Sequence, residues 1–125
     1  MISVFIGITH NTLSEDFIRE FQDKVDWKDV SRCQKLSEPF IREFQDKVDW
    51  TNITKYQKLS KKFIREFQDK IDWDEMSEKR LTEKFIREFQ DKVRWDYIYE
   101  IHGMRLSDKF IREFIDKFEP LFDRI

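Results

Sequence analysis

Apolar residues recur along the chain at the spacing of an amphipathic helix. Within residues 15–25 the apolar positions are Phe17, Ile18, Phe21 and Val25. At about 100° per residue these positions fall in one stripe roughly 100° wide, and charged or amide side chains take the rest of the turn. The pattern predicts a helix over 15–25 with one buried face.

Capping signals predict where the helices begin. Ser14 precedes this segment, and its hydroxyl can accept from the unpaired amides of a first helical turn. Leu13 and Ile18 have the spacing of a hydrophobic staple across that start. Asp26 can cap a second, shorter helix that begins at Trp27. Each unit is therefore expected to contain two helices, of about 11 and about 8 residues, which are marginal in isolation.

The same unit returns along the chain. The leucines that open the copies are spaced by 23, 23, 22 and 25 residues, and they are Leu13, Leu36, Leu59, Leu81 and Leu106. Four copies carry a tryptophan fourteen residues after the leucine, namely Trp27, Trp50, Trp73 and Trp95. Self-similarity at this period is typical of stacked arrays, in which short helices bury their apolar faces against neighbouring copies. We therefore expect the tryptophans to pack at the repeat junctions.

These patterns predict an all-α protein, an α-solenoid of tandem short helix-turn-helix repeats in a single domain. The expected order is an N-terminal cap segment (1–12), four helical hairpins (13–35, 36–58, 59–80, 81–105) and a C-terminal capping helix (106–125). In the last copy Pro120 takes the place of the tryptophan, as befits an end repeat. Arg94 takes the place of the capping aspartate in the fourth repeat, whose second helix is therefore expected to start differently.

Composition agrees with a folded helical protein. Of the 125 residues, 40% are charged and 16% aromatic, with two glycines and two prolines. The net charge of -2 gives no strong field toward nucleic acid or an anionic membrane. Cys33 is the single cysteine and cannot form an internal disulfide, and residues 1–12 are too short and lack the basic segment of a signal peptide. We predict a cytoplasmic protein that has no membrane partner.

Little in the sequence indicates catalysis. His10 and His102 are the only histidines, no cysteine or histidine pair has metal-ligand spacing, and no glycine-rich phosphate loop is present. The carboxylates lie on faces that are expected to be exposed. We therefore predict that the protein is not an enzyme and has no catalytic residue, metal ligand or cofactor.

The charged positions could form a ladder along the array. One arginine recurs in each copy, at Arg19, Arg42, Arg65, Arg87 and Arg112, and one lysine recurs likewise, from Lys24 to Lys117. Such a ladder could follow the phosphates of a nucleic acid. However, Arg19 lies four residues before Asp23 and Glu20 four before Lys24, so the charges are expected to pair within each copy. Nucleic acid is therefore a possible but not a favoured partner.

The copies differ mainly in the residues that follow each tryptophan. The first helix barely changes, whereas the outward positions of the second helix change at nearly every step. Varied side chains on a repeated scaffold are how solenoids acquire specific partners, although drift on a surface that contacts only solvent would give the same pattern. The candidate partner-binding residues are Lys28, Asp29, Arg32, Cys33, Asn52, Lys55, Tyr56, Glu75, Glu78, Lys79, Tyr97, Tyr99 and Glu100.

The fourth repeat adds a second distinctive feature. Its last segment is two residues longer than in the first two repeats and contains Tyr97, Tyr99, Ile101, His102, Gly103 and Met104. Aromatic and methionine side chains favour binding surfaces, although adjustment to the terminal cap would also explain the change.

The segments "LSEDFIREFQDKVDW" and "YQKLSKKFIREFQDKIDW" resemble the short, near-identical helical repeats of proteins from giant DNA viruses and some phages. The resemblance covers residues 13 to about 118, implies a viral or phage origin, and supplies no functional residue. Arg94 and the 25-residue fourth unit depart from the pattern.

Three function hypotheses remain open at this point. The first is a non-enzymatic repeat scaffold that binds a protein partner through the varied second helices, which for a viral protein would be a host factor that it inhibits or recruits. The second is a nucleic-acid-binding repeat protein that uses the Arg and Lys ladders. The third is a structural, self-assembling array, since the ends of a solenoid can stack on further molecules. The expected state is a monomer or a weak homo-oligomer.

Overall fold

The chain folds into paired short helices. The structure is a computed structural model that describes residues 12–124, and every regular element among them is a helix. The chain divides into two compact units, which meet in sequence between Asp72 and Trp73. The N-terminal cap predicted for residues 1–12 lies outside the described residues, apart from Thr12.

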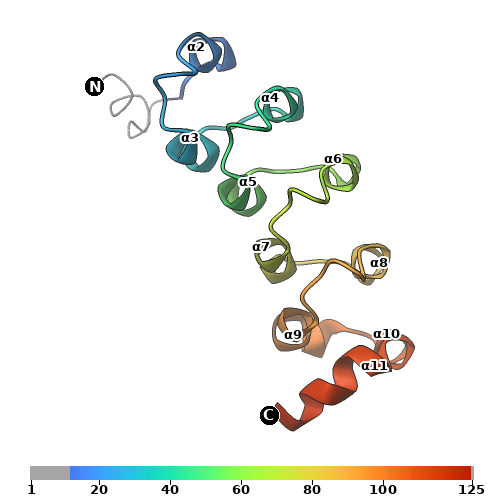
Figure 1. Ribbon diagram of the computed structural model, residues 1–125. Helices are drawn as coiled ribbons and strands as arrows, with labels where there is room; N and C mark the ends of the chain where they lie inside the picture. The colour runs from blue at the N-terminus through green and yellow to red at the C-terminus, as the bar shows by residue number, and fades with distance from the viewer. Residues whose placement is uncertain (1–11, 125) are drawn as a thin grey trace. The chain divides into compact units, whose positions relative to one another are not determined.

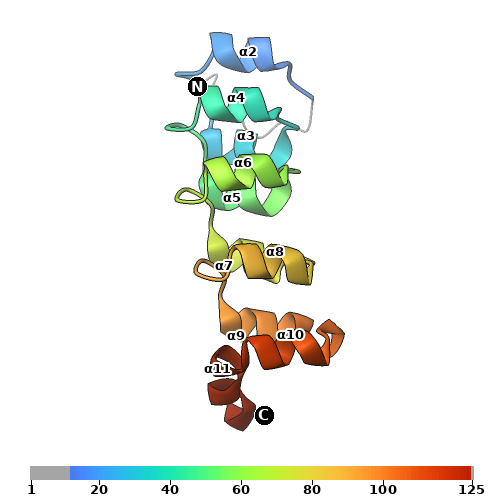
Figure 2. The ribbon, with the colours of Figure 1, turned by 90° about the vertical axis from the view of Figure 1, so that its right-hand side faces the viewer.

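The first unit contains two rows of helices. The first helices of the repeats are α2 (Glu15–Glu20), α4 (Glu38–Glu43) and α6 (Lys61–Glu66). The second helices are α3 (Trp27–Cys33) and α5 (Trp50–Tyr56). Figure 1 shows α2, α4 and α6 stacked in one row and α3 and α5 in the other, and Figure 2 shows the stack from the side.

The second unit begins with the same alternation of first and second helices, and this pattern ends after α9. It begins with α7 (Trp73–Glu78), α8 (Glu83–Glu88) and α9 (Trp95–Tyr97). The chain then forms a π-helix η1 (Ile98–His102), a 3₁₀ turn η2 (Gly103–Arg105), α10 (Asp108–Glu113), α11 (Ile115–Phe118) and the 3₁₀ segment η3 (Glu119–Arg124). The all-α repeat fold predicted from the sequence is confirmed.

Local capping sets the helix starts. The Ser14 hydroxyl accepts from the Phe17 amide, and the Asp26 carboxylate accepts from two amides at the start of α3. The helix of the fourth repeat still begins at Trp95, although Arg94 gives it no side-chain cap. The start therefore differs in its capping, as expected from Arg94, but not in its position.

The first helix of each repeat is shorter than predicted. The helix expected over 15–25 ends at Glu20, and Phe21 leaves the helical conformation with φ -105° and ψ 29°. The indole Nε1 of Trp27 donates to the carbonyl oxygen of Gln22 at 2.9 Å. A continued helix would use that carbonyl for the amide four residues later, so the tryptophan stabilises a turn instead.

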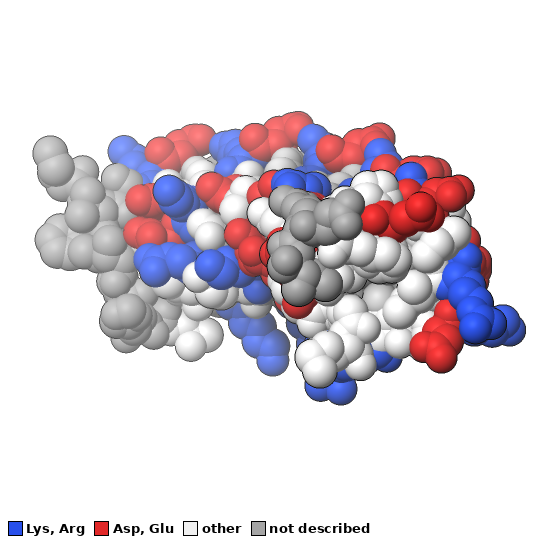
Figure 3. Space-filling view, turned by 90° about the horizontal axis from the view of Figure 1, so that it is seen from below, with Lys and Arg blue, Asp and Glu red and all other residues white. Residues whose placement is uncertain are grey.

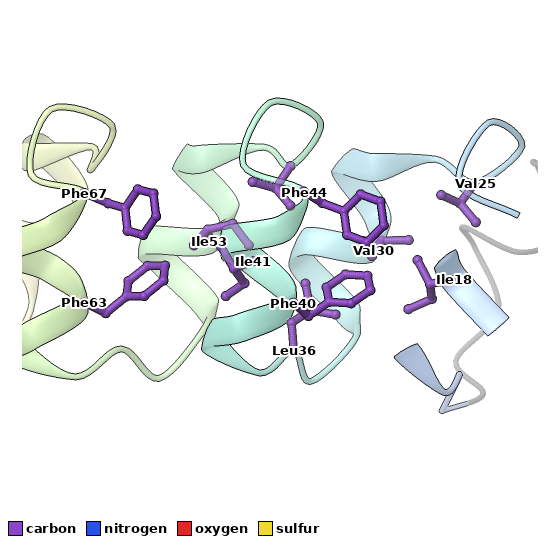
Figure 4. Packing of buried hydrophobic residues seen from close by; sticks show 11 residues of the cluster. Ile18, Val25, Val30, Leu36, Phe40, Ile41, Phe44, Ile53, Phe63 and Phe67 are labelled. Atoms are coloured by element: carbon purple, nitrogen blue, oxygen red, sulfur yellow. The ribbon is translucent and has the colours of Figure 1, made fainter. Parts of the chain in front are cut away.

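Apolar side chains from successive repeats interlock in the core of the first unit. Ile18, Ile41 and Ile53 have no exposed surface, and Phe40 is 1% exposed. Figure 4 shows these residues between the two rows of helices. The ring of Trp27 lies 6.2 Å from that of Phe40, its neighbour in the next repeat. The prediction that the tryptophans pack at repeat junctions is confirmed, and the core explains why the short helices are stable only as a stack.

Buried polar side chains also connect the repeats. The Gln57 side chain accepts from the Leu36 amide at 3.1 Å and donates to the carbonyl oxygens of Ser31 at 2.9 Å and Gln34 at 2.6 Å. The Ser31 hydroxyl accepts from the Asp49 amide in the next repeat at 3.0 Å. These bonds fix the register of one repeat on the next, because a buried polar group is costly without a partner.

Candidate functional site

The arginine ladder connects neighbouring repeats. Arg19 pairs with Glu43 at 2.9 Å, one repeat further along the chain. The equivalent contacts are Arg42 with Glu66 at 2.8 Å and Arg87 with Glu113 at 2.9 Å. Arg19 also pairs within its own repeat, with Asp16 at 2.6 Å. The predicted pair of Arg19 with Asp23 is wrong, because the helix ends at Glu20 and Asp23 pairs with Lys47 of the next repeat at 3.2 Å instead.

In these three arginine-glutamate pairs, the carboxylate neutralises the charge of the arginine. Hydrogen bonds from the arginines lower the pKa of the carboxyls of Glu43, Glu66 and Glu113. The Arg42 guanidinium also lies 5.7 Å from the centre of the Phe63 ring in the next repeat. A phosphate group would have to compete with these carboxylates for Arg19, Arg42 and Arg87, which weakens the case for nucleic-acid binding along the ladder.

The candidate residues on the second helices lie at different depths. The exposed ones are Lys28, Arg32, Cys33, Lys55, Tyr56, Glu78 and Glu100. The half-buried ones are Asp29, Glu75, Lys79, Tyr97 and Tyr99. Asn52 was expected on the outward surface but is only 9% exposed, and its side chain donates to the Lys28 carbonyl oxygen at 3.2 Å. That expectation is wrong because Asn52 faces the preceding repeat across the stack.

In the first unit, three of the candidate residues gather at one cleft. We call it the basic cleft; its volume is about 290 Å³, and it is lined by Arg32, Cys33, Gln34, Lys35, Tyr56, Gln57 and Lys58. Tyr56 is 51% exposed, and the Lys55 ammonium lies 5.4 Å from the centre of its ring. Asp29 pairs with Arg32 at 2.9 Å, so cations outnumber anions here. The cleft therefore combines an open aromatic ring with excess positive charge.

In the second unit, two candidate residues line a larger apolar cavity. We call it the terminal hollow; its volume is about 560 Å³, and it is lined by Tyr99, Glu100, Gly103, Met104, Leu106, Ile111, Phe118 and Phe122. Met104 is fully exposed and Phe122 is 42% exposed. Figure 3, which views the chain from below Figure 1, shows uncharged residues on the near face with charged side chains around it. The hollow arises where the fifth repeat lacks the tryptophan-led second helix.

Other candidate residues of the second unit have structural contacts. Arg94 pairs with Asp74 at 3.0 Å and with Asp96 at 2.9 Å, and its guanidinium lies 4.5 Å from the centre of the Tyr97 ring. Burial lowers the pKa of Lys79, and the nearby Glu75 opposes that shift. Tyr97 and Lys79 therefore contribute to packing as well as to the surface.

His102 has a structural role that the sequence did not reveal. It was grouped with the surface-favouring residues of the fourth repeat, but it has no exposed surface. Its Nε2 lies 3.2 Å from the Ser77 carbonyl oxygen, and its Nδ1 contacts Arg105. The equivalent bond in the second repeat runs from Gln57 to Ser31, and both side chains stand 21 residues after the opening leucine. Burial lowers the pKa of His102.

Small polar residues recur in the second helices, and the sequence did not reveal that their hydroxyls form hydrogen bonds with the next repeat. The hydroxyls of Ser31, Thr54 and Ser77 each accept from the amide of the residue that precedes the next second helix, at 3.0, 3.1 and 2.9 Å. The only signal in the sequence was that a small polar residue recurs at this position.

The part of the chain that the structure covers contains neither a cluster of metal-ligand residues nor a membrane-spanning helix. Residues 12–124 contain no group of three or more His, Cys, Asp or Glu side chains that could hold a metal ion. No helix among them is both long and apolar enough to cross a bilayer.

Comparison of the chain with protein-family models, with curated proteins and with solved structures finds no match.

Proposed function

We propose that this chain is a non-enzymatic repeat scaffold that binds a protein partner through its second helices, with the basic cleft as the main contact. The observation that carries the proposal is the exposed Tyr56 ring beside a cleft whose charged walls are Arg32, Lys35 and Lys58. Tyrosine and arginine are enriched where proteins bind one another, and an open ring beside a concave surface can anchor a partner side chain.

Charge indicates the chemistry of the partner. The second-helix row of the first unit carries Lys28, Lys35, Lys55 and Lys58, and none of these lysines makes an ion pair among the described residues. Arg32 is neutralised by Asp29. An acidic protein segment with an apolar or aromatic side chain would complement this surface, and long-range attraction would speed its association at low salt.

A protein partner fits this surface better than a nucleic acid. The chain has a net charge of -2, and the arginines of the ladder already contact carboxylates. Unpaired lysines of the first unit remain for phosphates, but affinity for nucleic acid depends on how many phosphates are neutralised, and the paired arginines of the ladder add little to that number. A viral origin and a host factor as the partner stay predictions from the resemblance.

A charge-reversal experiment tests the proposal. Tagged wild-type protein is used to capture proteins from nuclease-treated lysate, next to Tyr56→Ala and the double variant Lys35→Glu with Lys58→Glu. The matched control is Lys24→Glu with Lys62→Glu, which makes the same change of charge at exposed lysines on the first-helix side. Circular dichroism verifies that each variant is folded.

The proposal predicts a specific protein that wild type and control retain and the two cleft variants lose. A labelled acidic peptide should follow the same order of affinity. Equal capture by all four proteins would refute the basic cleft as the contact. Retention of nucleic acid alone, lost on nuclease treatment, would favour the nucleic-acid hypothesis instead.

A further inference from the structure

Two polar contacts recur at the junctions between repeats. In the first, the arginine of one repeat pairs with the glutamate of the next, as Arg42 does with Glu66. In the second, a glutamate at the start of one first helix accepts from the capping serine of the next. Glu38 accepts from the Ser60 amide at 2.6 Å and from its hydroxyl at 2.9 Å. The glutamates that make this second contact are Glu15, Glu38 and Glu83, whereas Lys61 stands at the same position in the third repeat.

In the first repeat, the residues that would receive these two contacts from a preceding repeat have no such partner among the described residues. Glu20 stands where Glu43 stands in the second repeat, is exposed, and makes no ion pair within residues 12–124. Ser14 caps its own helix but donates to no carboxylate in that part of the chain. Phe17 is 39% exposed, whereas Phe40, at the same position in the second repeat, is 1% exposed.

The last repeat carries the complementary groups, which would contact a following repeat. Arg112 and Asp108 occupy the positions of the arginine and of the acidic residue at the helix start, and both are exposed. Neither makes an ion pair or side-chain hydrogen bond to another described residue. Ile111 is only half-buried at the edge of the terminal hollow, whereas its equivalent Ile41 has no exposed surface.

We infer that a second copy of this chain docks head-to-tail, with its first repeat on the last repeat of the first copy. Arg112 of one molecule pairs with Glu20 of the next, as Arg42 does with Glu66 and Arg87 with Glu113 within the chain, and Asp108 accepts from Ser14. Phe17 of the second copy lies against the Arg112 guanidinium and the apolar wall of the terminal hollow. The charges are complementary, and the contact continues the geometry of the internal junctions.

The contact joins two different surfaces and does not close on itself. Such a heterologous contact extends into chains whose length rises with protein concentration, unless the rotation per molecule closes a ring. The missing tryptophan of the fifth repeat removes the stacking seen between Trp95 and Phe110 at an internal junction, at a ring distance of 6.4 Å. The association is therefore weaker than the junctions within the chain. It uses the ends of the array and is independent of the basic cleft.

A charge-swap experiment on the full chain tests the inference. Sedimentation velocity measures mass against concentration, from micromolar to millimolar, for wild type, Glu20→Arg and Arg112→Glu. Each single variant places like charges across the contact and should weaken self-association roughly tenfold or more. Lys62→Glu, an exposed charge change away from the ends, should leave it unchanged.

An equimolar mixture of Glu20→Arg and Arg112→Glu provides the decisive measurement. Each variant repels its own copies. In the mixture, however, the introduced arginine of one variant meets the introduced glutamate of the other, and the native Arg112 of the first meets the native Glu20 of the second, so association should return. The inference is overturned if wild type is monomeric at every concentration. It is equally overturned if the single variants associate as wild type does, or if the mixture stays monomeric while circular dichroism shows both variants folded.

Discussion

Replacing Gln57 by leucine tests whether buried polar bonds between repeats stabilise the array. Gln57 is 6% exposed, and its side chain makes three hydrogen bonds to the main chain of Ser31, Gln34 and Leu36. Leucine has a similar volume but can form none of these hydrogen bonds. One amide and two carbonyl oxygens would then lose a partner inside the stack.

The expected loss follows from those three bonds. Each hydrogen bond contributes about 1 kcal/mol, and a buried group left unpaired costs roughly 1 to 3 kcal/mol. The greater burial of apolar surface by leucine offsets part of this cost. We expect Gln57→Leu to lower the free energy of unfolding by about 3 kcal/mol.

Urea unfolding followed by far-UV circular dichroism measures the change, and hydrogen exchange with mass spectrometry locates it within the first unit. The matched control is Gln45→Leu, because Gln45 is half-buried and donates only to the Arg42 carbonyl oxygen of its own repeat, at 3.0 Å. Water can replace that bond, so the control should change the stability by less than about 0.5 kcal/mol. If the two variants were equally stable, the role assigned to the buried glutamine would be wrong.

Further predictions concern the core, a buried histidine and the charge ladder. Ile53→Ala removes a side chain with no exposed surface and should cost about 2 to 5 kcal/mol in urea unfolding, whereas the exposed Lys55→Ala should cost little; a loss below about 1 kcal/mol would contradict the assigned core. Burial lowers the pKa of His102, so the stability it supports is complete above the unfolded pKa of about 6.5 and is lost as the pH falls below that value. His102→Gln should flatten this pH dependence of the melting temperature, and an unchanged profile would rule out His102 as its source. Glu66→Gln breaks the exposed pair with Arg42, and its effect on stability should be small and should vanish in high salt; an effect that persists in salt would show that the pair is not screened.

Local signals predicted the elements well. The capping roles of Ser14 and Asp26 depend on amides two or three residues away, so the sequence contains both partners of each contact. The repeat period and the apolar stripe likewise predicted the stacked helices and the packing of Trp27 on Phe40. The length of the first helix was not predictable from the stripe, since the turn depends on an indole bond that competes with the helix.

The candidate surface was predicted only in part. Variation among the copies located Arg32, Cys33 and Tyr56, which the structure places at one cleft. The same variation wrongly included Asn52, because a position can vary and still be buried against the neighbouring repeat. The terminal hollow depends on how α11 and η3, which stand in place of a tryptophan-led second helix, pack in the fifth repeat, so no single motif indicates it.

By itself the sequence determined the helices, their starts and their repetition, because those features depend on contacts within a few residues or on identity between copies. Only the tertiary structure decided that Arg19 pairs with Glu43 and that His102 takes the role of a glutamine. Those partners lie 24 and 25 residues away along the chain. The register of one repeat on the next brings them together, and that register is set by the packed core and its buried polar bonds.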